Sequence, residues 1–195
     1  QQDQKVGSNS GSTIMQVAPP SNISVGDLII VTIHVNSNTG NINNSEGFTL
    51  IRRDYYSSSN QVTVASLYKI ATAADVGRVT PYQFTMANVS SDDRIYSSRI
   101  TGHNVSSPIG NNNGVAQYLN YPAEGYMNVV IPSVNTTSAN SMLVSLLAIN
   151  VATTGTVDVE FINSPAGSTT MYYNDYETTS RVAQELRTNI GATGT

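Results

Sequence analysis

The sequence predicts an all-β protein, an antiparallel β-sandwich of jelly-roll-like design built from two related halves as one domain over residues 1–195. Three observations predict this fold. Short apolar or alternating segments recur along the chain with Gly, Pro and Asn between them, which is the pattern of sandwich strands. The mostly β-branched segment Val25–Val35 has apolar residues on both strand faces, as a central strand requires. A second segment of this kind, Ser141–Ile149, lies in the second half.

In the first half, a polar Gly/Ser-rich stretch, residues 1–12, precedes the first predicted strand. We expect it to be a mobile arm, an edge strand or a strand donated to a neighbouring copy. The Asn-rich residues 36–46 predict an exposed loop, and at most one short helix is expected, at residues 71–76. Strands are expected at residues 13–17, 25–35, 47–51, 61–70, 82–86 and 94–101.

The second half repeats the order of the first, and the two copies cover about residues 13–110 and 126–195. No single match is strong, so the common order carries the inference of a repeat. The matched segments are residues 14–17 with 127–131, 25–35 with 142–149, 47–50 with 167–170, and 64–67 with 183–186. Strands of the second half are expected at residues 127–131, 142–149, 157–162, 169–173 and 181–186.

The surface must be polar but carry little charge. Charged residues make up 11% of the chain, against about 25% in ordinary soluble domains, while Asn, Ser and Thr supply 66 of the 195 residues. Such compositions are common in secreted fibres and surface proteins, so an extracellular or cell-surface location is expected. The chain begins with Gln1 rather than Met, as it would after removal of a leader.

Charge and cysteine content exclude several classes of function. The net charge is -4 and only two lysines are present, Lys5 and Lys69, so no basic patch for nucleic acid can form. The absence of cysteine removes disulfides, thiolate metal sites and cysteine nucleophiles. No apolar run reaches the roughly 20 residues of a membrane-spanning helix, so no membrane insertion is expected.

No arrangement of residues indicates catalysis, and we expect no enzyme activity. His34 and His103 are the only histidines, and no Gly-x-Ser-x-Gly motif accompanies them. The same scarcity of ligands argues against zinc. Asp92, Asp93 and the loop at residues 36–46 can offer oxygen atoms to a structural calcium ion, but no calcium-loop pattern is present, so no cofactor is expected.

Tyrosine is the dominant aromatic residue, with 11 Tyr, 3 Phe and no Trp. Tyrosine rings can stack on sugars, or they can cap the core and contact a neighbouring subunit. We favour the second role, because sugar-binding sandwiches usually rely on the larger face of Trp. The candidate glycan or subunit contacts are Tyr118, Tyr121, Tyr172, Tyr173 and Tyr176.

Two kinds of covalent modification have candidate residues. Among the Asn-x-Ser/Thr sequons, Asn43 and Asn104 are the best candidates for glycosylation because they are expected in loops. Lys69 lies on a predicted strand. It can form an isopeptide cross-link, as in some surface pilins, if a carboxylate lies beside the reacting pair.

A resemblance to a known kind of domain rests on six short motifs and their order. The motifs are Val25–Ile30, Gly47–Ile51, Leu67–Ala71, Tyr82–Thr85, Arg99–Gly102 and Ser107–Ile109. In this order the chain resembles, over nearly its whole length, a β-sandwich domain of bacterial secreted and surface proteins and of phage fibre or tail proteins. The resemblance implies an extracellular structural or adhesive role, and it says almost nothing about activity.

The first functional hypothesis is a structural subunit of an extracellular fibre, filament or surface appendage that polymerises with copies of itself. The alternatives are a monomeric carbohydrate-binding or adhesin module and a phage tail or decoration protein. The second half ends before any equivalent of strands 82–86 and 94–101, so its sheet edge is expected to accept a donated strand. The expected donor is the N-terminal arm, with Ile14, Met15 and Val17 as its apolar anchors.

Overall fold

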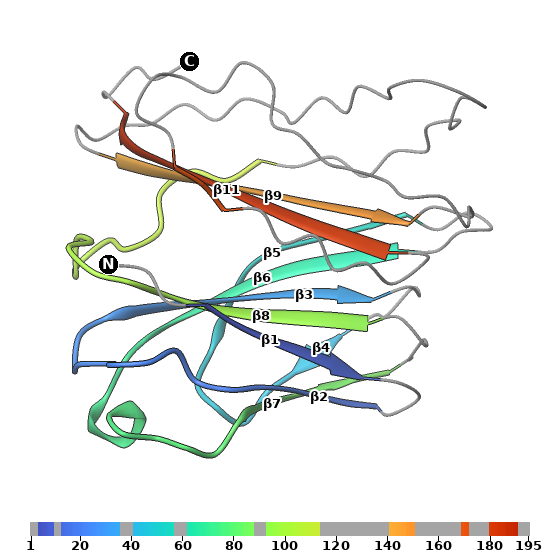
Figure 1. Cartoon of the computed structure of the whole chain (residues 1–195), viewed down its shortest axis with the longest axis horizontal. Coiled ribbons are helices and arrows are strands. Elements are labelled where there is room, and N and C mark those ends of the chain that lie inside the picture. The colour runs from blue at the N-terminus through green and yellow to red at the C-terminus, as the bar shows by residue number, and fades with distance from the viewer. Residues whose placement is uncertain are drawn as a thin grey trace. The chain divides into compact units, whose positions relative to one another are not determined.

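The computed structural model of the chain contains two compact units, residues 1–109 and residues 110–195, which are described separately (Figure 1). All regular structure in the described residues is antiparallel β-structure, apart from one short turn of helix. The predicted all-β class is therefore confirmed. The described residues are 4–9, 13–35, 41–56, 62–87, 93–113, 141–150, 169–171 and 180–190.

The first unit is a sandwich of two sheets, here named sheet A and sheet B. Sheet A has the strand order β1-β8-β3-β6-β5, and sheet B has the order β2-β7-β4. The strands are β1 (Gln4–Asn9), β2 (Ile14–Val17), β3 (Leu28–Val35), β4 (Ile42–Asn43), β5 (Thr49–Tyr56), β6 (Val62–Ile70), β7 (Tyr82–Met86) and β8 (Asp93–Ile100).

Strand pairing in this unit is nested, as it is in a jelly roll. The first strand pairs with the eighth, the second with the seventh and the third with the sixth. The fourth nested pair, between β4 and β5, is not formed, because β5 pairs with the far edge of β6 and β4 with the far edge of β7. One side of the sandwich is therefore left open between two edge strands.

The core lies between the two sheets and is built from alternate residues of each strand. On β3 the residues Ile29, Val31 and Ile33 face the core, while Leu28 and Ile30 on the opposite face are also buried. This two-sided burial is what the apolar residues on both faces of the segment predict. The other core residues are Met15, Val17, Ile23, Val35, Phe48, Ala65, Leu67, Ala71, Tyr82, Phe84, Met86 and Ile95.

The division into units differs from the single domain expected over residues 1–195. Residues 1–109 supply both sheets and the core between them, so the first copy of the repeat is a whole sandwich rather than half of one. The physical reason is the short alternating strands of sheet B. Every second residue of β2 and β7 is buried, which gives the second layer that sheet A needs.

The second unit contains β9 (Ser141–Asn150), β10 (Thr169–Met171) and β11 (Ser180–Ile190) in the order β10-β11-β9. The first unit has the same order in β5-β6-β3, and these are the segments that the repeat matches. In each sheet the strand of the 25–35 match pairs with the strand of the 64–67 match, since Val31 lies opposite Leu67 and Val144 lies opposite Leu186.

The predicted open edge of the second half concerns β9. In the first unit β8 pairs with the edge of β3 that β6 leaves free, whereas within residues 141–150, 169–171 and 180–190 no strand takes the equivalent place beside β9. The expected strands at residues 127–131 and 157–162 lie outside the described residues. The missing strand therefore stays a prediction.

The expected helix is a single 3-10 turn, η1 (Ala73–Asp75), within residues 71–76. The Asp75 carboxylate accepts a hydrogen bond from the backbone N–H of Thr72, which closes the turn. Gly77 follows with φ +69, a conformation that favours glycine and ends the turn. Throughout the described ranges no helix has the length and apolarity to cross a membrane.

Candidate functional site

Three ion pairs gather at one end of the first sandwich. Leu28, at the start of β3, lies opposite both Ile70 and Ile100, so β6 and β8 end where β3 begins. The turns that follow β6 and β8 and precede β3 and β5 therefore meet here. The pairs join Asp27 to Arg99, Lys69 to Asp75, and Glu46 to Arg78.

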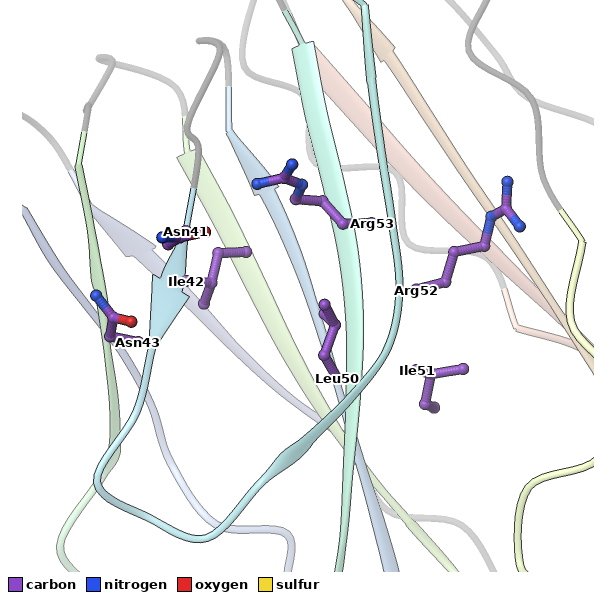
Figure 2. A pocket seen from close by; sticks show the side chains of 7 residues that line it. All are labelled: Asn41, Ile42, Asn43, Leu50, Ile51, Arg52 and Arg53. Atoms are coloured by element: carbon purple, nitrogen blue, oxygen red, sulfur yellow. The ribbon is translucent and has the colours of Figure 1, made fainter.

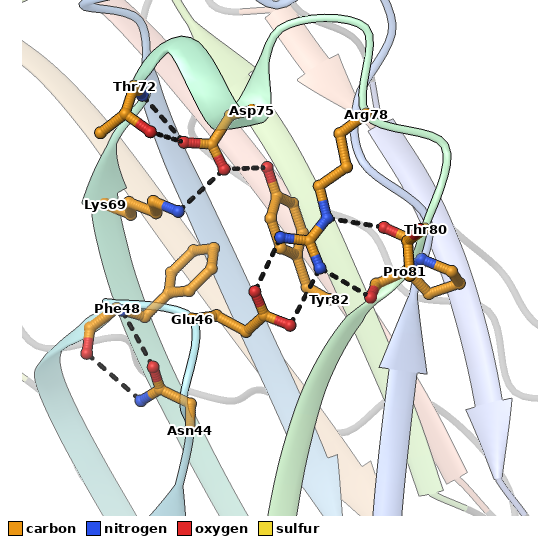
Figure 3. Close-up of polar contacts among 10 residues, drawn as sticks. All are labelled: Asn44, Glu46, Phe48, Lys69, Thr72, Asp75, Arg78, Thr80, Pro81 and Tyr82. Atoms are coloured by element: carbon orange, nitrogen blue, oxygen red, sulfur yellow. Dashed lines mark hydrogen bonds and ion pairs between the residues drawn. The ribbon is translucent and has the colours of Figure 1, made fainter.

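In the pair of Lys69 and Asp75, the buried carboxylate of Asp75 accepts four hydrogen bonds (Figure 3). Oδ1 of Asp75 accepts hydrogen bonds from Nζ of Lys69 at 2.8 Å and from the hydroxyl of Tyr82 at 3.1 Å. Oδ2 accepts from the backbone N–H of Thr72 at 2.8 Å and from its Oγ1 at 2.9 Å. Burial alone would raise the pKa of Asp75, but the bonds from Lys69 and Thr72 outweigh burial and lower it.

Arg78 makes the second pair and covers the ring of Tyr82. Its guanidinium binds both oxygens of Glu46, at 2.7 and 2.9 Å, and lies 4.5 Å from the ring centroid of Tyr82. The same group donates to the carbonyl oxygens of Thr80 and Pro81. Hydrogen bonds from Arg78 lower the pKa of Glu46 more than burial raises it. The charges of Arg78 and Glu46 are therefore paired with each other.

The third pair connects two of the resemblance motifs. Nε of Arg99 lies 2.6 Å from Oδ2 of Asp27, which also accepts the backbone N–H of Ser24 at 2.8 Å. The backbones of Gly26 and Asp27 exchange hydrogen bonds with Ala71. Burial alone would raise the pKa of Asp27, but the bonds from Arg99 and Ser24 lower it. The motifs thus hold the turns of the sandwich together, which is a structural role.

Acid should destabilise the fold, because Asp27, Glu46 and Asp75 each have a lower pKa in the folded chain than when unfolded. Each contributes stability that is present above its ordinary pKa, 3.8 for Asp and 4.5 for Glu, and is lost as pH falls through the folded value. The thermal midpoint should hold from about pH 7 to about pH 5 and fall steadily below it. A midpoint unchanged at about pH 3 would contradict this assignment.

A second candidate site is a cleft of about 520 Å³ on the open side of the sandwich, between β4 and β5. Figure 2 shows Ile42 extending from β4 toward β5, and Leu50 and Arg53 extending from β5 toward β4. The cleft combines apolar side chains with amide and guanidinium groups. Its lining residues are Asn41, Ile42, Asn43, Leu50, Ile51, Arg52 and Arg53.

A β-bulge decides which side chains of β5 line this cleft. The register shifts between Leu50 and Arg52, so Ile51 is the extra residue. After the shift Arg53 lies opposite Ala65, a core residue, and therefore shares the inner face of sheet A with Leu50. The guanidinium of Arg53 lies 5.6 Å from the ring centroid of Tyr55, which is half exposed. Without the bulge Arg53 would face outward.

The predicted donor residues belong to the sheets of their own unit. β1 pairs with β8, and β2 pairs with β7, so both N-terminal strands lie at sheet edges. Met15 and Val17 are fully buried in the core, while Ile14 is 41% exposed. In this structure the arm therefore closes its own sandwich.

Other predicted residues are spread over the chain. Asn43 is exposed and lines the cleft; Asn104 is exposed, and its Oδ1 accepts the N–H groups of Ser106 and Ser107. The two histidines lie at opposite ends of sheet A and form no common site, since His34 is near the end of β3 and His103 follows the end of β8. The tyrosines Tyr118, Tyr121, Tyr172, Tyr173 and Tyr176 lie outside the described residues.

Of the oxygen atoms considered for calcium, those in the described residues form no common site. Asp92 lies outside the described residues, Asp93 is buried on β8, and Glu46 binds Arg78. Among the residues that the structure describes, no group of three His, Asp or Glu side chains is arranged to hold a metal ion.

Comparisons of the chain with protein families, with curated proteins and with solved structures found no match. Function must therefore be argued from the residues, and the resemblance to secreted and phage sandwich domains remains an expectation.

Proposed function

We propose that the chain is a structural subunit of an extracellular assembly, in which neighbouring copies are joined by exchange of the N-terminal strands β1 and β2. One observation carries the proposal. The first two strands of the chain are edge strands, β1 of sheet A and β2 of sheet B. A single segment, residues 1–17, can thus leave both sheets of one copy and enter both sheets of another.

Exchange requires no new interface. The bonds of β1 to β8 and of β2 to β7 are re-formed between copies in the same register, as in domain swapping. Met15 and Val17 enter the core of the accepting copy and anchor the arm. Pro19 and Pro20 follow after Ala18 and stiffen the hinge, since proline restricts φ.

The geometry of exchange predicts the form of the product. A segment that leaves one copy and enters the next makes a head-to-tail contact, which builds an open filament unless the rotation closes a ring. The low charge and high Asn, Ser and Thr content support a place outside the cell, on a fibre or surface appendage, with the virion surface as the alternative.

The test is assembly with and without the arm, followed by electron microscopy and sedimentation. The full chain should form filaments, and deletion of residues 1–12, which removes β1, should abolish them. A peptide of residues 1–17 added in excess should shorten the filaments by occupying acceptor sheets. The matched control is the same peptide carrying Met15→Ser and Val17→Ser, which should have no effect. Filaments that persist unchanged after deletion of residues 1–12, and whose length the peptide of residues 1–17 does not alter, would refute exchange.

A second candidate, a carbohydrate-binding module, has one observation in its favour. The open cleft places the amides of Asn41 and Asn43 near Arg53, and Tyr55 lies against that guanidinium. Such a combination can bind sugar hydroxyls and stack on a sugar ring. In the same experiment, a chain that stays monomeric and binds a glycan array, with binding lost in Tyr55→Ala, would favour this candidate over assembly.

A further inference from the structure

We propose that Lys69 and Asp75 become joined by an isopeptide bond, formed within the chain between Nζ of the lysine and Cγ of the aspartate. The proposal does not depend on how the protein assembles. It rests on the contacts around the Asp75 carboxylate that Figure 3 shows.

The two reacting groups are held together by the fold. Lys69 lies at the end of β6, and Asp75 lies in η1, the turn that follows. Nζ lies 2.8 Å from Oδ1. A contact of this length places the amine next to the carboxyl carbon, and fixed proximity gives a reaction within one chain a high effective concentration.

The pair can react only after one proton has passed from the lysine to the aspartate, and the site keeps water away from both groups. The side chain of Asp75 is 0% exposed and that of Lys69 is 13% exposed. Nζ lies 5.8 Å from the ring centroid of Phe48 and 5.7 Å from that of Tyr82. The two groups are charged at rest, because hydrogen bonds hold the pKa of Asp75 below its usual range. Transfer of one proton along the contact from the ammonium to the carboxylate yields an amine and an acid, which are the reacting forms.

The hydrogen bonds of Asp75 fit the steps of amide formation. The amine attacks Cγ, so that the new C–N bond forms while Oδ2 gains negative charge. The N–H and Oγ1 of Thr72, at 2.8 and 2.9 Å, stabilise that charge as an oxyanion site does. A second amine proton moves to Oδ1, to which Tyr82 also donates a hydrogen bond. The bond from Cγ to Oδ1 then breaks, and Oδ1 leaves as water.

The reaction is balanced without any co-reactant. The ammonium begins with three protons, of which two leave in the water molecule and one remains on the amide nitrogen. No net charge is created or lost, because the positive lysine and the negative aspartate disappear together. The neighbouring cation Arg78 does not compete, since it binds Glu46 and has no nucleophilic amine in its protonated form.

The test is the intact mass of the full chain, purified, aged at neutral pH and then denatured. The mass should be lower than the sequence requires by one water molecule. Fragmentation after digestion should show the loss in a peptide where residues 69 and 75 are linked. The Lys69→Arg variant keeps a cation but has no amine and should have the full mass. In Asp75→Asn the loss should be one ammonia instead of water.

Further variants separate reaction from folding. Thr72→Ala should retain the circular dichroism spectrum of the parent while water loss slows about a hundredfold. Tyr82→Phe should slow water loss as well. A parent chain that keeps its full mass after prolonged incubation would overturn the proposal. So would water loss that persists in Lys69→Arg, because the aspartate would then be dehydrating with its own backbone.

Discussion

Replacing Phe84 by alanine should lower the free energy of unfolding by about 3–5 kcal/mol, measured by chemical denaturation. Phe84 is fully buried on β7 and faces sheet A across the core. Its ring meets that of Phe48 edge to face, with 5.3 Å between the centroids. Truncation removes this contact and leaves a cavity that two stiff sheets cannot close.

The matched control for Phe84→Ala is its neighbour on the same strand. Thr85 is exposed, and its replacement by alanine should cost less than about 1 kcal/mol. Equal losses in the two variants would mean that β7 does not form the second layer of the sandwich.

Replacing Arg99 by alanine should lower the free energy of unfolding by about 3–5 kcal/mol, because it leaves the buried carboxylate of Asp27 without its cation. The side chains of Arg99 and Asp27 are only 10% and 12% exposed, and the distance between them is 2.6 Å. In chemical denaturation, the midpoint should move to a lower denaturant concentration, while the dependence of the unfolding free energy on denaturant stays unchanged.

The chain offers a control of the same chemistry and the same distance. Arg52 and Asp54 also lie 2.6 Å apart, but their side chains are 33% and 26% exposed. Since solvent screens such a pair, Arg52→Ala should cost between about 0 and 1 kcal/mol. A similar loss for both arginines would contradict the argument that burial makes the Asp27–Arg99 pair important.

The fold class can be predicted from sequence because its signals are local. The two-sided burial of β3 follows from apolar residues on both faces of one segment, and the alternation in β7 follows from every second residue. The sequence also predicts an internal repeat, and the strand order β10-β11-β9 agrees with the order β5-β6-β3. The position of the single helical turn follows from a short Ala-rich segment.

What the sequence does not reveal depends on contacts between distant residues. The pairing of Asp27 with Arg99 joins residues 72 positions apart, and no spacing rule predicts it. The inner-face position of Arg53 depends on a bulge at Ile51, a residue that looks like any other in a strand. The division of the strands of the first unit between sheets A and B cannot be predicted either, because periodicity does not say which sheet a strand joins.

The site residues show the same division between local and distant signals. The sequence predicts that Lys69 can form an isopeptide cross-link if a carboxylate lies beside the reacting pair, but it names no reaction partner and places Asp75 only in a helical turn. The two residues are only six positions apart, across the end of a strand. The sequence predicts Met15 and Val17 as apolar anchors of a donated arm, and in the structure they lie in the core of their own unit.

The most direct test of strand exchange uses cysteine, which the natural chain lacks. Gln4 of β1 lies opposite Ser98 of β8. The variants Gln4→Cys and Ser98→Cys are to be mixed unfolded, assembled together and oxidised. Exchange predicts a dimer whose disulfide joins position 4 of one chain to position 98 of another. A mixture without that dimer, together with a double variant that closes entirely within single chains, would contradict the proposed exchange.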